Sequence, residues 1–487
     1  MTPIYDIAVL GAGPAGMAAA TEAALRGARV ALLDESPAPG GQVYRDTPPG
    51  WRVTPDADRR AGDALRAALA GTSAEVLTGH RVWGLGGGPL VPEGADAAPF
   101  RIDALPVAGA PLTLEARALV LCPGTHERII PFPGWTLPGV IGLAAATILL
   151  KAQGVLPGRR VVVAGAGPLL YAVAAKLLKA GAAVPAVVDL AATADWARAL
   201  PALAAKPGLL LRGAAWRAKL LALNIRVLPA HRVSAAEGGI ALERVRVAPL
   251  ARGIGSPLGS GEAEEFDCDA LCIGHGLVPA TEATRCFRAA HAYRPEDGGW
   301  VPVLDDDRRT SVTRLYVAGD GGGVRGAAAA PAAGRLAALA ALRDLGRISA
   351  PEHDRARAAP ARGFRRAART GGAMARMMAL RPALVEAIPT ETVVCRCEGV
   401  TRGEIEGAAA DGAADMNQLK QFTRCGMGPC QGRVCGEAAA EILARQVGGR
   451  ESAGFATGRL PLRPVPMEAL LGEFDYADIP VPKPAPI

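Results

Sequence analysis

A glycine-rich turn near the start of the 487-residue chain constrains the fold more than any other stretch. Residues 4–10 form a short apolar run, Gly11-Ala12-Gly13-Pro14-Ala15-Gly16 follows at once, and residues 17–26 are rich in alanine. A second apolar run, 30–33, ends in Asp34. Strand, glycine turn, helix, strand and acid, in this order, predict a dinucleotide-binding βαβ unit.

The residue types in this turn have physical reasons. Gly11 permits the tight turn, and Gly13 lets the backbone approach a pyrophosphate that the helix N-terminus attracts. Gly16 allows the helix to pack closely on the strand, and Asp34 can accept hydrogen bonds from a ribose diol. The alternative is a turn that needs glycines for its backbone alone. We predict that the cofactor-binding residues of this unit are Gly11, Gly13, Pro14, Ala15, Gly16, Asp34 and Glu35.

Three further stretches indicate which dinucleotide binds. Pro39-Gly40-Gly41-Gln42 resembles the flavin-side loop of thioredoxin-reductase-like flavoproteins, which implies FAD. The apolar run 116–121 ends in Cys122-Pro123-Gly124-Thr125, where the resembled proteins have a strand that crosses beside the FAD. The run 315–318 ends in Gly319-Asp320, and the resemblance implies that this carboxylate binds the ribityl chain, the alternative being a helix N-cap. The resemblance adds Gly41, Gln42, Gly124, Gly319 and Asp320 to the predicted FAD site.

A second unit of the same kind begins at residue 160. Strand 161–164, the turn GAGPLL, helix 171–179 and strand 184–188 lead to Asp189. Leu170 stands at the third glycine position, where a branched side chain obstructs close packing and narrows the phosphate approach. Pro185 predicts an edge strand or irregular pairing. We therefore expect a retained fold without nicotinamide turnover; a second nucleotide, NAD(P) or ATP, is left open but is not favoured.

Five of the nine cysteines stand between Cys395 and Cys435. They form a CxC pair at 395 and 397, a single thiol at 425, and a CxxxxC pair at 430 and 435. In a cytosolic chain such a cluster indicates a metal rather than disulfides. Four thiolates hold iron–sulfur clusters. Zinc sites usually space paired ligands more widely than CxC does, so we favour iron–sulfur over zinc and over inert thiols.

The sequence around these cysteines resembles a known domain. CRCEGVT (395–401) and TRCGMGPCQGRVC (423–435) resemble the bacterioferritin-associated-ferredoxin-like [2Fe–2S] domain. Together with GGQVYR (40–45), GAGPLL (165–170) and LRPVPMEAL (462–470), they resemble the FAD-dependent α-type subunits of the opine oxidase, hydrogen cyanide synthase and D-hydroxyproline dehydrogenase family. This resemblance covers nearly the whole chain. It implies that the cluster ligands are Cys395, Cys397, Cys430 and Cys435, with Cys425 left out.

We expect an α/β fold of two dinucleotide-binding domains, like that of thioredoxin and glutathione reductases, followed by a small helical [2Fe–2S] domain. The FAD domain is assigned to 1–150 and 265–345, and the inserted nucleotide-binding-like domain to 151–264. An arginine-rich linker (346–390), the cluster domain (391–445) and a tail (446–487) complete the assignment.

The net charge of +7 is concentrated in one place. Eight arginines stand against one acid between residues 353 and 381, and the rest of the chain is balanced, which argues against nucleic-acid binding. This run is either a solvated helix face or linker, or a docking surface for an acidic partner. Without a long apolar run or an N-terminal leader, we expect a cytoplasmic protein, which can still dock at a membrane.

The function follows from the two cofactors. A disulfide reductase of this fold needs a redox cysteine pair beside the flavin, yet residues 1–121 and 151–264 contain no cysteine. His126 and His275 follow strand-to-turn crossovers, but structural roles are favoured for both, so the catalytic residues are unassigned. A flavin takes two electrons and a [2Fe–2S] cluster carries one, so we expect an oxidoreductase subunit that transfers electrons.

The resemblance also implies partners. It points to a catalytic flavoprotein β-type subunit, with or without a small ferredoxin-like subunit, in a complex that oxidises the C–N bond of an amino or imino acid. Opines, D-hydroxyproline or proline, and glycine are the substrate classes left open, and a quinone at the membrane is one open acceptor. The alternatives are an NAD(P)H-dependent flavin reductase that feeds a ferredoxin-type acceptor, and a stand-alone FAD dehydrogenase.

Overall fold

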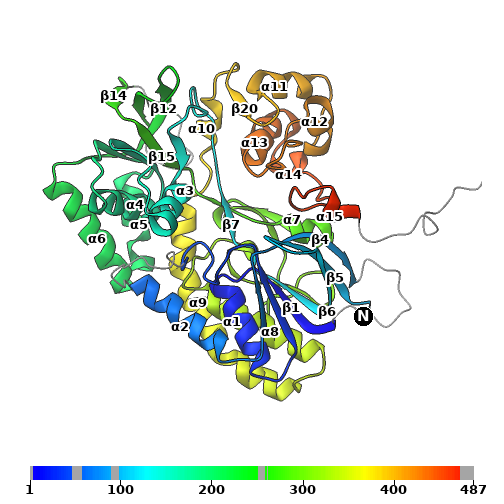
Figure 1. Cartoon of the computed structure of the whole chain (residues 1–487). Helices are drawn as coiled ribbons and strands as arrows, with labels where there is room; N and C mark the ends of the chain where they lie inside the picture. The colour runs from blue at the N-terminus through cyan, green and yellow to red at the C-terminus, as the bar shows by residue number, and fades with distance from the viewer. Residues whose placement is uncertain (1–3, 46–56, 89–97, 251–257, 260, 472–487) are drawn as a thin grey trace, which may run out of the picture.

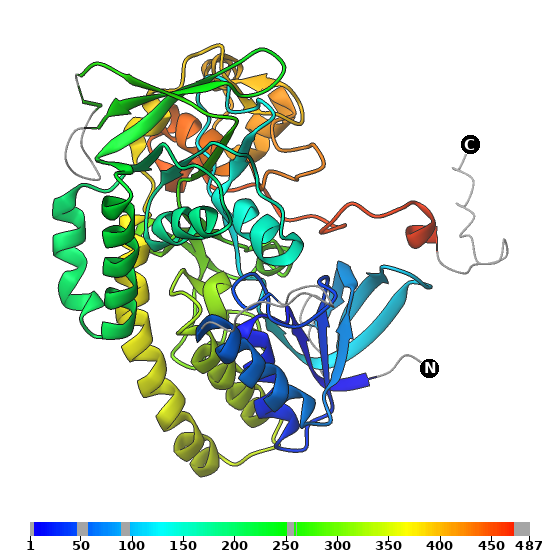
Figure 2. The same ribbon diagram turned by 60° about the vertical axis from the view of Figure 1, so that its left-hand side comes forward.

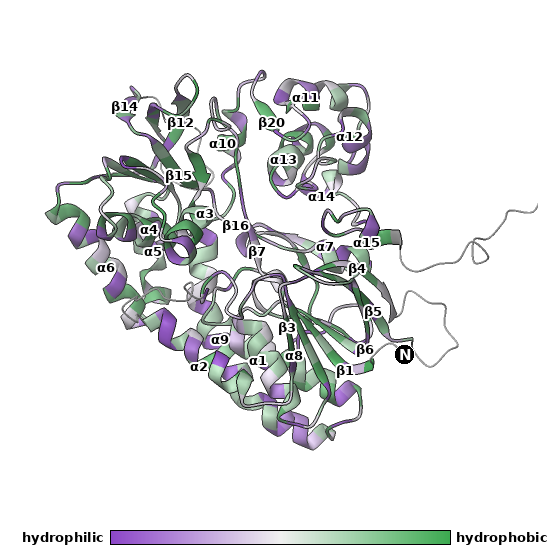
Figure 3. Cartoon of the chain, in the orientation of Figure 1, coloured by the Kyte–Doolittle hydropathy of each residue, from purple (hydrophilic) through white to green (hydrophobic). Residues whose placement is uncertain are grey.

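The computed structural model describes residues 4–45, 57–88, 98–250, 258–259 and 261–471. Figure 1 shows a sheet-based domain at the bottom, a second one at the upper left and a small helical domain at the upper right. The strands at the centres of the two larger domains are mostly hydrophobic, while α2 (Ala57–Ala70) and α6 (Pro207–Ala222) alternate between hydrophilic and hydrophobic residues (Figure 3).

The lower domain is built on the first glycine turn. β1 (Ile4–Leu10) pairs in parallel with β2 (Val30–Asp34) on one side and with β6 (Leu112–Leu121) on the other. The apolar runs therefore lie at the centre of the sheet, where both faces are covered. The sheet order is β3-β2-β1-β6-β5-β4, and β19 pairs with the second half of β6. The remaining strands are β3 (Glu75–Thr78), β4 (His80–Gly87), β5 (Phe100–Pro106) and β19 (Leu315–Val317).

Small residues let two helices approach closely over this sheet. α1 (Pro14–Ala24) follows the glycine turn and packs against α8 (Ala330–Asp344). A Cβ atom on Gly334 would lie only 2.0 Å from the carbonyl oxygen of Ala15, so the contact requires glycine there. The helix N-terminus of α1 is thereby fixed at the carboxyl end of β1.

The second domain repeats the strand-turn-helix-strand unit. β9 (Val161–Gly165), α4 (Pro168–Lys179) and β10 (Ala186–Asp189) follow in the expected order. The expected edge or irregular strand is not what forms, because β10 lies between β9 and β11 (Arg226–Pro229) with regular parallel pairing. Pro185 precedes the strand and so removes no ladder hydrogen bond.

The second sheet takes in strands that the sequence analysis assigned to the FAD domain. Its order is β11-β10-β9-β15-β8, so β15 (Ala270–Gly274) and β8 (Val140–Gly142) both belong to it. An apolar run followed by a glycine turn suits either sheet. Only the pairing of β15 with β9 shows that β15 belongs to the second sheet. A three-stranded antiparallel sheet completes this domain with β12 (His231–Glu237), β13 (Arg244–Pro249) and β14 (Glu264–Asp267).

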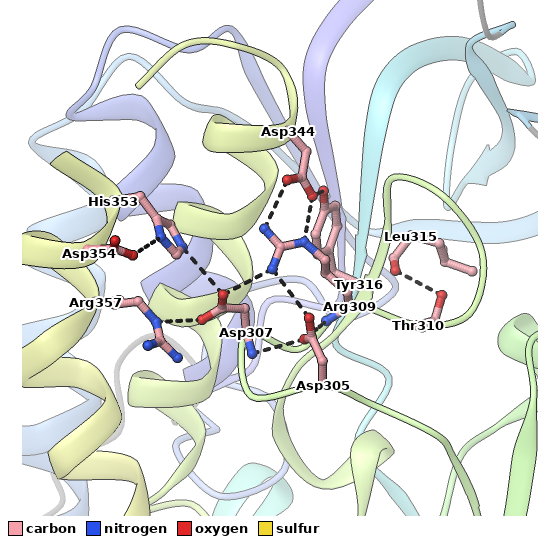
Figure 4. A network of polar contacts seen from close by, with 10 residues as sticks. All are labelled: Asp305, Asp307, Arg309, Thr310, Leu315, Tyr316, Asp344, His353, Asp354 and Arg357. Atoms are coloured by element: carbon pink, nitrogen blue, oxygen red, sulfur yellow. Dashed lines mark hydrogen bonds and ion pairs between the residues drawn. The ribbon is translucent and has the colours of Figure 1, made fainter. Parts of the chain in front are cut away.

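The arginine-rich segment contains a helix of 28 residues, α9 (Ala350–Met377), which begins after the N-cap Ser349. It packs on α8 and on α5 (Thr193–Leu203), and so runs from the lower domain to the second one (Figure 2). Figure 4 shows how a polar network attaches it to the lower domain. Asp307 accepts hydrogen bonds from Arg357 Nε of α9 at 2.7 Å and from Arg309 Nη1 at 3.0 Å. Arg309 in turn pairs with Asp344 of α8 at 2.7 Å.

The helical domain packs around its own apolar core. A short hairpin of β20 (Val393–Cys395) and β21 (Val400–Thr401) leads into α11 (Arg402–Ala410), which Thr401 and Glu404 begin with a reciprocal capping box. The other helices of this domain are α12 (Met416–Thr423), α13 (Gly436–Val447) and α14 (Arg450–Ala453). In the described part of the chain, we find no helix with both the length and the apolar character needed to span a bilayer.

Candidate cofactor sites

A cavity of about 360 Å³ opens at the carboxyl end of β1, where ligands of open α/β sheets bind. It brings together residues from both sequence halves of the predicted FAD site, although more than three hundred positions separate Gly11 from Asp320. Gly16 lies outside the lining, beneath the turn. The predicted residues that line the cavity are Gly11, Gly13, Pro14, Ala15, Asp34, Glu35, Gly41, Gln42, Gly124, Gly319 and Asp320.

The glycines of the first turn divide into two kinds. A Cβ atom on Gly11 would lie 2.3 Å from the Cys122 carbonyl oxygen, and one on Gly16 would lie 1.8 Å from the Gly11 carbonyl oxygen. Both glycines are thus required by the protein itself. A Cβ atom on Gly13 would meet nothing closer than Gly41 Cα at 3.9 Å, so its space is open to the cavity. Gly13 therefore fits the close approach of a pyrophosphate rather than the turn alone.

Asp34 is held in position at the end of β2. Its Oδ2 accepts the Ala12 N–H at 2.6 Å, and its Oδ1 accepts the Ser36 N–H at 2.7 Å. Each carboxylate oxygen can accept a further hydrogen bond. The oriented carboxylate at the cavity wall suits a ribose diol.

Asp320 also lines the cavity. Its Oδ1 accepts backbone N–H groups from Arg325 at 2.8 Å and Gly326 at 2.7 Å, which leaves Oδ2 outside these bonds. Burial raises the pKa of this carboxyl, although both N–H groups act in the opposite direction. The N-cap of α8 is Ala329, so Asp320 does not cap that helix. Its place fits a hydrogen bond to a flavin side chain.

Cys122 is the one cysteine among the described residues that line this cavity. Burial raises the pKa of its thiol to about 12, so it is not a thiolate nucleophile at neutral pH. The cavity therefore lacks the redox pair of a disulfide reductase.

All five clustered cysteines gather at one end of the helical domain. The sulfur atoms of Cys395, Cys425 and Cys435 lie within 4.8 Å of one another. Cys430 is hydrogen-bonded to Cys435 and to Cys397, so the five thiols form one connected group. Hydrogen bonds from Cys425 and Cys435 lower the pKa of Cys395 to about 2. Such a set of convergent sulfur atoms fits a thiolate-bound metal cluster.

Glycines supply backbone donors to this group. The Gly426 N–H points to the sulfur of Cys395, and the Gly432 N–H points to that of Cys430. A Cβ atom on Gly428 would lie 2.2 Å from Cys397 Cβ, so the loop closes tightly over the CxC pair. Hydrogen bonds of this kind to sulfur tune the potential of an iron–sulfur cluster.

The structure adds a thiol that the sequence analysis left out. Cys425 is buried and lies 4.0 Å from Cys435, measured between the sulfur atoms, whereas the expected ligand Cys397 is exposed. The expected set nevertheless forms two contacting pairs, Cys395 with Cys435 and Cys397 with Cys430. Two pairs match two irons with two thiolates each. We therefore retain Cys395, Cys397, Cys430 and Cys435 as the proposed ligands.

The two histidines named from the sequence differ in their surroundings. His275 is buried, its Nδ1 accepts the Ile130 N–H at 3.3 Å, and burial together with the charge of Arg128 lowers its pKa to about 3. His126 lines the FAD cavity, and its Nε2 lies 2.8 Å from Glu282 Oε1. His275 is a structural residue, whereas His126 faces the cofactor site.

The second glycine turn is filled by the protein. A Cβ atom on Gly167 would lie 2.9 Å from the side chain of Met378, which thus covers the turn. Asp189, at the position of a ribose-binding acid, is buried and accepts Tyr171 Oη–H at 2.7 Å and Trp196 Nε1–H at 2.9 Å. Leu170 lies in the core. These contacts favour the expectation that this unit turns over no nicotinamide.

Comparisons with known proteins agree with this geometry. Residues 5–335 match the family of pyridine nucleotide-disulphide oxidoreductases, and residues 393–445 match the BFD-like [2Fe-2S] binding domain. The chain is a flavoprotein oxidoreductase of that family, and its cofactors are FAD and a [2Fe–2S] cluster. Within it, the chain belongs with the matching subunits of opine oxidase and hydrogen cyanide synthase. The predicted fold class, cofactors and family resemblance are therefore confirmed.

The relatives match over nearly their whole length. An opine oxidase subunit of Agrobacterium tumefaciens (strain Ach5) is 36% identical over 96% of this chain and 92% of the relative. The HcnB subunit of hydrogen cyanide synthase from Pseudomonas protegens is 34% identical over 95% of this chain and 96% of the relative. The L-proline dehydrogenase of P. horikoshii shares the fold, with a TM-score of 0.68 at 20% identity over 96% of this chain and 80% of that one.

Proposed function

We propose that this chain is the electron-transferring subunit of a hetero-oligomeric dehydrogenase that oxidises the C–N bond of an amino or imino acid. When bound, FAD accepts electrons in a pair and the cluster carries them singly. The residues of the chain hold the two groups, exclude a disulfide step and keep the sites side by side.

One observation carries the proposal. A second cavity, of about 240 Å³, borders Cys425 and Cys435 of the cluster domain. His126 and Leu462 line both this cavity and the FAD cavity. A site for a two-electron group therefore adjoins a site for a one-electron group within one chain, which is the arrangement that intramolecular electron transfer requires.

The names of the relatives support a partner and a substrate class. The opine oxidase and hydrogen cyanide synthase relatives are each named as one subunit of an enzyme. The alpha subunit of sarcosine oxidase from Corynebacterium sp. (strain P-1) is 26% identical over 96% of this chain and 45% of the relative. We infer a catalytic flavoprotein β-type subunit, with or without a small ferredoxin-like subunit, and an opine, proline-like acid or glycine as substrate.

Coexpression tests the proposal. The chain together with a candidate flavoprotein subunit should form a stable complex that reduces an artificial dye when an opine, a proline-like acid or glycine is added. The chain alone should bind FAD and the cluster but should not reduce the dye with any of these substrates. Full substrate-dependent dye reduction by the chain alone would refute the proposal.

The alternative, an NAD(P)H-dependent flavin reductase, has less support. Met378 covers Gly167, and Asp189 is fully buried beneath Tyr171 and Trp196, so the two positions that would meet a phosphate and a ribose are both covered by the protein. Rapid mixing with NADH or NADPH should leave the flavin oxidised, and fast bleaching of its absorbance by either would favour the alternative.

A further inference from the structure

The boundary between the two cofactor sites carries one carboxylate with two partners. Glu282 begins the short helix α7 (Glu282–Cys286), and its Oε1 lies 2.8 Å from Nε2 of His126. His126 belongs to β7 (Thr125–Glu127), directly after the Cys122–Gly124 turn of the FAD cavity. The first partner of Glu282 is thus a residue of the flavin site.

The second partner belongs to the cluster loop. Arg433 stands between the proposed ligands Cys430 and Cys435, and its Nε lies 2.8 Å from the same Oε1 of Glu282. The side chains of Glu282 and Arg433 are 27% and 13% exposed, so solvent screens this pair only in part. Burial alone would raise the pKa of Glu282, but the hydrogen bond and charge of His126 and the charge of Arg433 lower it.

Two other glutamates line the same cavity, and neither joins the domains in this way. Glu127 accepts the Ala144 N–H at 2.7 Å and so caps the helix that follows β8. Glu437 pairs with Arg450 at 3.0 Å inside the cluster domain. Among the described glutamates that line this cavity, Glu282 is thus the one in contact with both a flavin-site residue and the cluster loop.

A stretch of the tail makes a parallel connection. Gln431 Nε2 donates to the Pro461 carbonyl and Arg433 Nη2 to the Leu462 carbonyl, each at 2.8 Å. The Leu462 N–H then donates to the Trp83 carbonyl of β4, also at 2.8 Å. The cluster loop is therefore attached to the FAD domain at two places, through Glu282 and through residues 461–462.

We propose that Glu282 is a positioning residue for electron transfer, which fixes the cluster loop against the flavin site by binding His126 and Arg433 together. With both groups bound, the contact would hold the cluster loop at the distance over which one electron would pass from the reduced flavin to the oxidised cluster. The inference rests on the proposed function, because it assumes that this transfer occurs within the chain. The rate of electron transfer between two bound groups falls as the distance between them grows, so a cluster loop that is no longer held against the flavin site should accept the electron more slowly.

The experiment uses the full chain with both cofactors bound. FAD, iron and sulfide contents and both midpoint potentials are measured for the wild type, E282Q and E282D. The flavin is then reduced by a light pulse, and the paramagnetic signal of the reduced cluster is followed in time. We expect unchanged contents and potentials, with cluster reduction several-fold slower in E282Q. E282D keeps the charge but shortens the reach, and should fall between E282Q and the wild type.

The control is E386Q, which removes an ion pair between the segment before the cluster domain and Arg445 of α13; Glu386 lines neither cofactor cavity. It should transfer at the wild-type rate. R433Q removes the pair with Glu282 and also the hydrogen bond to the Leu462 carbonyl, so it should be at least as slow as E282Q. The double variant should be no slower than R433Q, because E282Q then has no further contact with the cluster loop to remove. A wild-type transfer rate in E282Q would overturn the inference. If E282Q loses a cofactor, a wild-type rate in E282D would overturn it instead. A wild-type chain whose cluster is never reduced by its flavin would instead refute the proposed function.

Discussion

The glycines of the first turn differ in whether the folded backbone or the bound cofactor requires them. Gly11 and Gly16 are fixed by backbone oxygens of the protein less than 2.5 Å from where a Cβ would lie. Gly13 has an ordinary extended conformation, with φ −69°, and open space around it. A side chain at position 13 is therefore compatible with the folded chain and incompatible with a bound pyrophosphate.

Replacement of Gly13 by valine tests this distinction. We expect a folded protein with a normal thermal transition that no longer retains FAD, because the branched side chain occupies the place of the pyrophosphate. Flavin absorbance after gel filtration is the measurement. Gly86→Val is a matched control, since position 86 in β4 also has open space and lies outside the cavity lining. Full yellow absorbance in Gly13→Val would contradict the assignment.

The cluster ligands are tested by paired serine variants. Cys430→Ser should lose the paramagnetic signal of the reduced protein, because one iron loses one of its two thiolates. Cys425→Ser should keep the signal and equal amounts of iron and sulfide, although Cys425 lies 4.0 Å from Cys435. Equal loss of iron in both variants, or zinc in place of iron in the native protein, would show that the ligand set is wrong.

At the level of residues, the sequence indicates where side chains that directly follow an apolar strand lie, but not which distant side chains contact one another. Gly13, Asp34 and Asp320 follow strands that the sequence displays as apolar runs, so their convergence at one cavity was predictable. The contact between Glu282 and His126 joins positions 156 residues apart, and no sequence period links them. The hydrogen bonds of Asp189 could not be predicted from the sequence either. Their donors, Tyr171 and Trp196, have the sequence pattern of ordinary core aromatic residues.

At the scale of elements, the sequence indicated which segments are strands but not which sheet each joins. β15 and β8 are short apolar runs that suit a parallel sheet anywhere, and their place beside β9 follows from the long crossovers that connect them. The sequence left the segment of the 28-residue helix α9 open between a linker and a solvated helix face, because a run of arginines suits both. Packing on α8 and α5 stabilises it where propensity alone does not.

The network around Asp307 (Figure 4) holds α9 to the lower domain. Its carboxylate meets Arg357, Arg309 and His353, and its side chain is only 13% exposed. Asp307→Asn leaves these donors without their charged acceptor, which should cost about 1–3 kcal/mol of stability. Thermal unfolding followed by flavin release should report a lower transition. The exposed neighbour Asp306 is the control, and Asp306→Asn should leave the transition unchanged; equal transitions in both variants would contradict this role.

At the scale of the whole molecule, the cavities proposed for the cofactors and the surface proposed for partner binding lie in different places. The cavity proposed for FAD and the cavity beside the clustered cysteines share His126 and Leu462, and Glu282 lines the second of them. Most of the excess positive charge lies on α9. This helix extends along the outside of both larger domains (Figure 2). Arg362, Arg365, Arg366 and Arg369 are exposed and lie in the middle of this helix. Basic charge of this kind speeds association with an acidic partner more than it adds affinity.

Reversal of these four arginines to glutamate is the test of the docking surface. We expect slower assembly with the catalytic flavoprotein subunit, because the attraction that guides the encounter becomes repulsion. The association rate is measured at low and at high salt, and the difference from the wild type should shrink at about 1 M salt, where the screening length is only about 3 Å. FAD content, iron content and the internal transfer rate should not change, since α9 carries no residue that lines either cofactor cavity.

The control reverses four exposed arginines outside α9 and alters the net charge equally: Arg81, Arg288, Arg294 and Arg343. Equal slowing in the control and the α9 variant would show that net charge alone, and not the α9 surface, guides the partner.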